Sequence, residues 1–119
     1  MANYDNQIVL KPLINALKND VAAVRLWSSS SLAEIGNVSF ENAQLAAEQL
    51  LISLKIDNES GVRSNCIWSL CRLYEKLNNS FQANCIDECS KMALFDKEPS
   101  VMEEAKTALD SMGMQGFYN

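Results

Sequence analysis

Residues Asp57–Arg63 read DNESGVR, a polar, turn-like stretch that leads into apolar residues at helical spacing. Two similar stretches occur in the chain: Asp20–Arg25 reads DVAAVR, and Asp96–Met102 reads DKEPSVM. The valines that precede Arg25, Arg63 and Met102 are 38 and 39 positions apart. A period of this length is typical of stacked helical hairpins, each of which is too small to bury its apolar face alone. The repeat therefore predicts an all-α fold of three hairpins.

Apolar residues recur at helical spacing in six segments, which predict about six helices. Because of Pro12, we expect the regular part of the first helix to begin near this residue. We expect Asp20 to cap the start of the second helix and Gly36 to end that helix in a left-handed conformation. The expected helices cover about residues 7–18, 21–36, 40–55, 62–77, 81–95 and 99–112. They form one domain, 1–119, with repeats at about 7–36, 40–77 and 81–113 and a short tail, 114–119.

Composition limits the class of protein. Nearly half of the 119 residues (48%) are hydrophobic, enough for one domain with a core. No apolar run approaches the length of a membrane span, and no signal peptide is evident, so we expect a cytoplasmic protein. Ten Lys and Arg against fifteen Asp and Glu give a net charge of -5, without a basic cluster. Nucleic acid and anionic membrane are therefore disfavoured as partners, whereas an acidic groove would attract a basic protein segment.

The repeated pattern of Asp, then Val-Arg, then a small pair, then Leu-x-x-Ile-Gly resembles a HEAT repeat. The similarity is to the short HEAT-like type of phycobilin lyases and stand-alone scaffold proteins, and it spans roughly residues 7–113. It implies a right-handed α-α superhelix, or solenoid, in which the second helix of each hairpin lines a concave face. The first repeat matches best, at Asp20, Val24, Arg25, Ser28, Ser29, Leu32, Ile35 and Gly36.

A structural ladder is expected where the hairpins turn. Stacking brings turn aspartates and first-turn arginines into register, so that each guanidinium can bridge to aspartates and turn carbonyls. Met102 replaces the arginine in the third repeat and fits an end cap. The predicted ladder consists of Asp20, Arg25, Asp57, Arg63 and Asp96.

Catalysis and metal binding are not indicated. The chain has no histidine, the commonest general base and metal ligand, and no phosphate-binding loop or nucleophile elbow. Adjacent carboxylates such as Glu103 and Glu104 point in different directions on a helix. Most of the four cysteines fall on expected core stripes, where thiols act as small apolar groups. We therefore expect no enzyme, no catalytic residue, no metal and no cofactor.

Two tryptophans fall at positions that periodicity assigns to solvent on the second helices of their hairpins. Such residues are typical anchors of protein interfaces, although packing of an indole over a neighbouring repeat remains an alternative. The candidate protein-binding residues on these helices are Trp27, Glu34, Asn65, Trp68, Arg72 and Glu104.

Two functions remain open. The first is a small adaptor or scaffold that binds a protein segment on its concave face. The second, implied by the resemblance, is an accessory factor to an enzyme, such as a bilin-lyase-like or cofactor-holding chaperone subunit. Absorbance titration with a tetrapyrrole separates the two. A monomer and a homodimer are both open: if Ile8, Val9 and Ile14 do not all face inward, the N-terminal end is expected to pair with another copy.

Overall fold

The computed structural model describes residues 3–114, with side chains from Val9 onward. This part of the chain is helical, which confirms the predicted all-α class. The predicted tail, 114–119, lies outside the described residues except for Met114. A short 3-10 helix, η1 (Tyr74–Lys76), follows the fourth helix. Within residues 3–114 the α-helices are α1 (Asn3–Ala16), α2 (Ala22–Gly36), α3 (Phe40–Ile56), α4 (Ser60–Leu73), α5 (Asn79–Phe95) and α6 (Pro99–Ser111).

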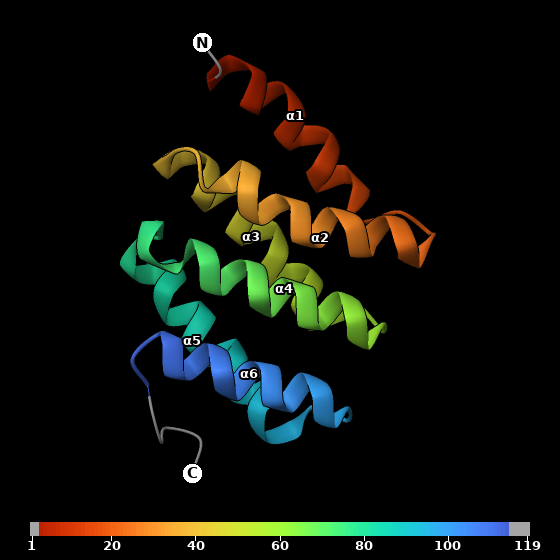
Figure 1. The fold of residues 1–119 in the computed structure, drawn as a ribbon, viewed down its shortest axis with the longest axis vertical. Helices are drawn as coiled ribbons and strands as arrows, with labels where there is room; N and C mark the ends of the chain where they lie inside the picture. The colour runs from red at the N-terminus through yellow and green to blue at the C-terminus, as the bar shows by residue number, and fades with distance from the viewer. Residues whose placement is uncertain (1–2, 115–119) are drawn as a thin grey trace.

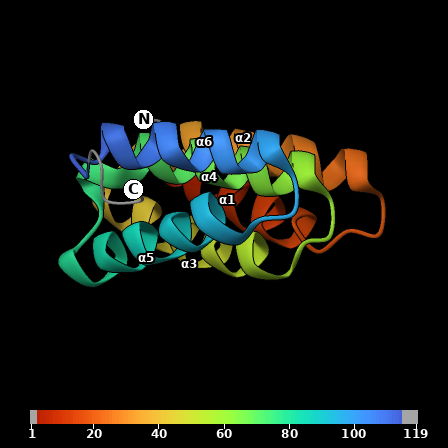
Figure 2. The ribbon, with the colours of Figure 1, turned by 90° about the horizontal axis from the view of Figure 1, so that it is seen from below.

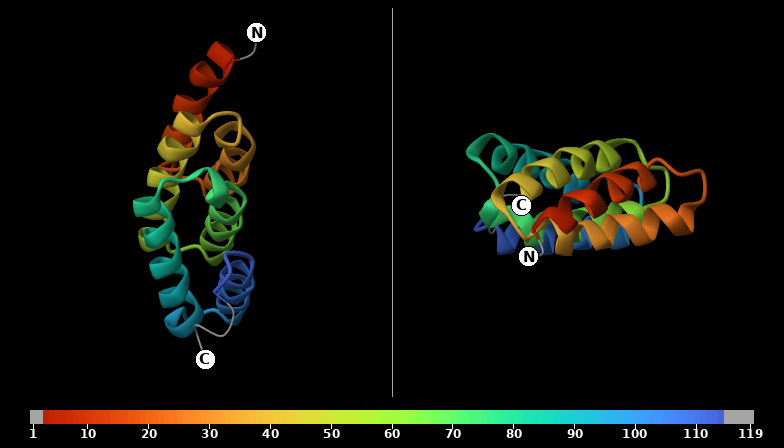
Figure 3. Two further views of the ribbon diagram at one scale, coloured as in Figure 1. Left: turned by 90° about the vertical axis from the view of Figure 1, so that its left-hand side faces the viewer. Right: turned by 90° about the horizontal axis from the view of Figure 1, so that it is seen from above.

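Successive helices alternate between two layers, so that each hairpin contributes one helix to each layer (Figure 1). Figure 2 and Figure 3 show α2, α4 and α6 side by side in one layer and α1, α3 and α5 in the other. The described residues extend over 45 × 31 × 17 Å, and the hairpins follow one another along the longest axis. One side of α2, α4 and α6 therefore forms an outer face, called here the α2–α4–α6 face. The right-handed superhelix implied by the resemblance stays a prediction.

The core lies between the two layers and consists mainly of leucine and alanine. Its largest members, among them Leu32, Ile67 and Leu70, are completely buried. Burial of one such side chain contributes about 1.5–3 kcal/mol relative to exposure. In α3 the apolar residues at helical spacing are all buried: Ala43, Ala47, Leu50, Leu51 and Leu54.

Helix ends follow side-chain chemistry. The Ser39 hydroxyl accepts a hydrogen bond from the Asn42 amide at 3.1 Å at the start of α3, which agrees with the predicted beginning of this helix. By contrast, α1 begins well before Pro12, so the prediction that its regular part starts near this proline was wrong. Pro12 is exposed while Leu10 and Leu13 are buried, so packing maintains the helix despite the missing N–H group.

Gly36 has a different role from the one expected. It is helical and has no positive φ; among the described glycines only Gly113 has one, at 84°. A Cβ atom at Gly36 would lie 3.0 Å from the Ala46 Cβ and 3.2 Å from a Leu73 methyl carbon. The residue is therefore glycine because α2 passes close to α3 and α4, and not because the chain turns there.

Candidate functional site

Trp68 lies on the side of α4 that helical spacing turns away from the core. Its neighbours Ile67 and Leu70 are fully buried, whereas 42% of Trp68 is exposed. The guanidinium of Arg72, one turn further along α4, lies 5.0 Å from the centre of the Trp68 ring. A cation at this distance is attracted to the ring face. Trp68 therefore presents a large aromatic surface that an intramolecular contact holds in place.

A shallow depression of about 340 Å³ lies beside this tryptophan and is called here the Trp68 depression. Among the described residues, none from α1, α3 or α5 lines it, so it opens on the α2–α4–α6 face. The Asn65 side chain is fixed at its wall, because Nδ2 donates to the carbonyl oxygen of Leu26 on α2 at 3.0 Å. The lining residues come from all three helices of this layer: Ser30 of α2, Ser64, Asn65 and Trp68 of α4, and Glu104 of α6.

The structure brings four of the six predicted binding residues together. Three of them line the Trp68 depression, and Arg72 stacks on the ring beside it. The other two, Trp27 and Glu34, are exposed on α2 and do not line the depression. Trp27 is 59% exposed, and it occupies the position on α2 that Asn65 occupies on α4. It therefore adds apolar surface to the same layer outside the Trp68 depression.

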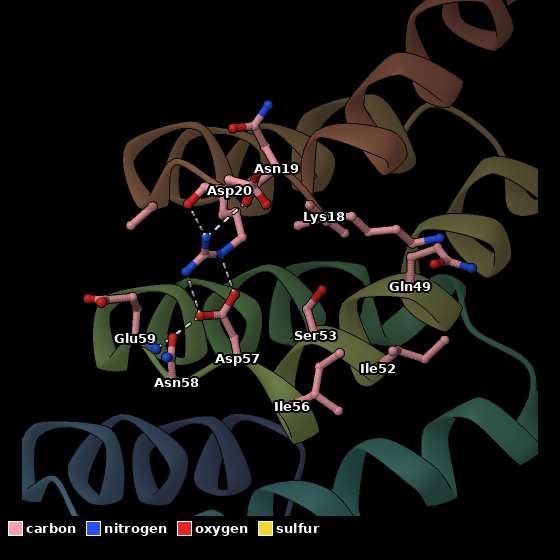
Figure 4. Close-up of a pocket in the computed structure, with 13 residues that line it drawn as sticks. Lys18, Asn19, Asp20, Gln49, Ile52, Ser53, Ile56, Asp57, Asn58 and Glu59 are labelled. Atoms are coloured by element: carbon pink, nitrogen blue, oxygen red, sulfur yellow. Dashed lines mark hydrogen bonds and ion pairs between the residues drawn. The ribbon is translucent and has the colours of Figure 1, made fainter.

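Arg25 and Arg63 connect successive hairpins at the edge where the chain turns. Arg63 donates from Nε and Nη2 to the Asp96 carboxylate at 2.8 and 2.9 Å, and from Nη1 to the Asp57 carbonyl at 3.1 Å. Arg25 donates to the Asp57 carboxylate at 2.8 and 3.3 Å and to two carbonyls of its own turn at 2.9 and 3.2 Å (Figure 4). Each arginine therefore joins its own turn to the next one, an arrangement that stabilises the stack.

Asn19, and not Asp20, is the counterpart of the aspartates of the later turns. Its Oδ1 accepts from the amide two residues further on at 2.8 Å, as Oδ1 of Asp57 and of Asp96 does at 2.9 Å. The prediction that the Asp20 side chain caps the second helix was wrong, because no side-chain hydrogen bond caps the start of α2. Asp20 contacts Arg25 of the ladder through its backbone carbonyl. The uncharged side chain of Asn19 makes the same hydrogen bond within its turn as Asp57 and Asp96 make in theirs. The two aspartates differ from Asn19 because each also forms an ion pair with an arginine.

The Arg63–Asp96 ion pair is the more buried of the two. The Arg63 side chain is 7% exposed and that of Asp96 is 4% exposed. Burial by itself raises the pKa of Asp96, but hydrogen bonds from Arg63 and the Glu98 amide, together with nearby positive charge, outweigh it and lower the pKa. The hydrogen bond to Asp96 in turn raises the pKa of Arg63. Both groups are therefore charged across the neutral range.

The four cysteines are free, and Cys66, Cys85 and Cys89 are fully buried, which confirms their predicted place in the core. Burial raises the pKa of all three thiols, that of Cys85 to about 12, so they stay protonated and unreactive. Among the described side chains no group of three or more His, Cys, Asp or Glu residues is placed to hold a metal ion. Within residues 3–114 no helix has the length and apolar character of a bilayer span.

Two exposed apolar side chains at the turn edge were not predicted. Ile56 is 75% exposed and Phe95 is 79% exposed, and each directly precedes a ladder aspartate. Ile56 lines the pocket of about 610 Å³ shown in Figure 4, and Phe95 lines a pocket of about 600 Å³ beside the following turn. In both repeats the residue immediately before the turn is apolar, although helical spacing does not place it on the core stripe. This pattern in the sequence could have identified the two exposed side chains.

Comparison with known proteins gives no family model that matches the chain and no curated protein that matches it. The HEAT-like assignment therefore rests on the repeated residues and stays a proposal.

Proposed function

We propose that the chain is a non-catalytic protein–protein interaction module, a small HEAT-like adaptor or scaffold that binds a segment of another protein. The binding surface is the α2–α4–α6 face, which the resemblance makes the concave side. The observation that carries this proposal is the exposed Trp68 beside a depression lined by three successive helices. A large indole next to a depression is the arrangement found at the energetic centres of protein interfaces.

Two further features support the use of this face. Trp27 exposes a second indole on the neighbouring helix, and Arg72 adds a guanidinium, so the residue types most enriched in interface centres are present together. The surrounding serine and asparagine side chains are short and leave the indole of Trp68 accessible. Trp68 is 42% exposed, and a partner that covered its indole would remove this apolar surface from water, which favours the complex.

A comparison of tagged variants in native lysate tests the proposal. We expect wild-type protein to retain a partner that Trp68→Ala loses, because a few anchor residues carry most of the binding energy of an interface. Phe40→Ala is the matched control, since Phe40 is 60% exposed but lies at the start of α3 in the other layer. Circular dichroism must show that both variants are folded. Equal recovery by wild type and Trp68→Ala would remove Trp68 from the binding surface.

A further inference from the structure

The hydrogen-bonding groups of the Trp68 depression are mainly acceptors. One N–H of the Asn65 Nδ2 donates to the Leu26 carbonyl, and Oδ1 is left as an acceptor. The Ser30 hydroxyl donates to the Trp27 carbonyl at 3.1 Å, which leaves its lone pairs. Ser64 contributes a second hydroxyl. The depression therefore suits a ligand that brings several donors.

Glu104 is the single charged residue that lines the depression in the described chain. None of the ion pairs among the described side chains involves its carboxylate. The negative charge of Glu104 therefore stands beside the ring of Trp68 without a cationic partner of its own. An aromatic wall and a carboxylate together are complementary to a cation.

From these contacts we propose that the Trp68 depression receives a basic side chain, arginine or lysine, from the partner segment. This inference rests on the proposed function and specifies the chemistry of the partner. The cation lies against the indole and donates to Glu104, to the Asn65 Oδ1 and to the serine hydroxyls. The net charge of -5 favours the approach of a basic segment over long range.

Arg72 does not occupy this place. It contacts the ring of Trp68 but is not among the residues that line the depression. At an exposed site solvent and salt screen the repulsion between Arg72 and a second cation in the depression. Arg72 therefore fixes the indole and leaves the depression to the incoming side chain.

The first experiment uses small probes on the whole chain. N-acetyl-arginine methylamide and N-acetyl-lysine methylamide are titrated into ¹⁵N-labelled protein, with N-acetyl-citrulline methylamide as the neutral isostere of the arginine probe. We expect a saturable shift of the Trp68 indole N–H with at least one of the two cations, in the millimolar range, and none with citrulline. An equal response to citrulline, or no saturable response to either cation up to about 50 mM, overturns the proposal.

Charge removal at Glu104 is the matching test on the protein side. Glu104→Gln should weaken binding of the cationic probe about two- to fivefold, the size of a solvent-exposed ion pair. Glu103→Gln is the control, since Glu103 is adjacent, exposed and paired with Lys106 at 3.6 Å, and it should leave the affinity unchanged. Equal affinities for wild type and Glu104→Gln contradict the role of the carboxylate.

The lysate partner separates this inference from the proposed function. If Trp68→Ala loses the partner and Glu104→Gln binds it less tightly in a salt-dependent way, both hold. If Trp68→Ala loses the partner but Glu104→Gln binds it as wild type does, the face binds protein and the basic side chain is wrong. If neither change affects capture, the α2–α4–α6 face is not the binding surface and both fail.

Discussion

Asp96 accepts two hydrogen bonds from Arg63 in a nearly buried pair, whereas no described hydrogen bond involves the carboxylate of Asp20. We expect Asp96→Asn to lower the free energy of unfolding by about 1–3 kcal/mol, because the arginine would remain buried without its counter-charge. Asp20→Asn is the matched control and should change it by less than about 0.5 kcal/mol. Urea unfolding at pH 7 measures both. Equal losses in the two variants would contradict the assignment of the ladder ion pair to the carboxylate of Asp96 and not to that of Asp20.

The lowered pKa of Asp96 also predicts how the difference in unfolding free energy between wild type and Asp96→Asn depends on pH. A carboxyl group with a lower pKa in the folded state stabilises the fold above its unfolded pKa of about 3.9, and that contribution is lost as the pH falls through the folded value. We therefore expect the gap between wild type and Asp96→Asn to be constant near neutral pH and to shrink below about pH 4. Urea titrations from pH 7 to pH 3 measure it, and a gap that widens on acidification would contradict the account.

Close approach of the layers makes α2 intolerant of a side chain at Gly36. We expect Gly36→Ala to destabilise the protein by about 1–2 kcal/mol, because the added methyl group would meet Ala46, which is fixed to the backbone of α3. The gain in helix propensity does not offset this crowding. Gly61→Ala is the control: its Cβ would meet only a flexible Leu26 methyl group, at 3.1 Å, so its stability should stay close to wild type. Thermal unfolding compares the two, and the reverse order would contradict the packing argument.

The helices were largely predictable, whereas the contacts between them were not. Stripes such as Leu50, Leu51 and Leu54 follow from periodicity alone, since each helix must bury one face. The role of Gly36 depends on two neighbouring helices. Asn19, by contrast, stands six positions before Arg25, as Asp57 does before Arg63, so the spacing of the repeat could have identified it. Trp68 could be identified as an exposed candidate, but the depression beside it required the positions of three helices.

Over the whole molecule, the buried thiols predict sensitivity to alkali. The thiols of Cys66, Cys85 and Cys89 have raised pKa values in the fold, and an unfolded thiol ionises near about 8.5. Their contribution is therefore present below about pH 8.5 and is lost as the pH rises, by about 1.4 kcal/mol per pH unit for each buried thiol. Urea unfolding in reducing buffer at pH 8 and pH 9.5 measures this slope, and Cys89→Ala should make it shallower. A free energy of unfolding that does not change between these pH values would contradict the burial of the thiols.

Site-specific photo-crosslinking identifies the surface on which the whole molecule binds its partner. A benzophenone amino acid placed at Trp68 substitutes one aromatic side chain for another on the α2–α4–α6 face, and the same group at Phe40 or Phe95 probes the other layer. We predict that irradiation in native lysate joins a protein partner to the chain from position 68 and not from position 40 or 95. Crosslinks formed from position 40 or 95 but not from position 68 would contradict binding on the α2–α4–α6 face.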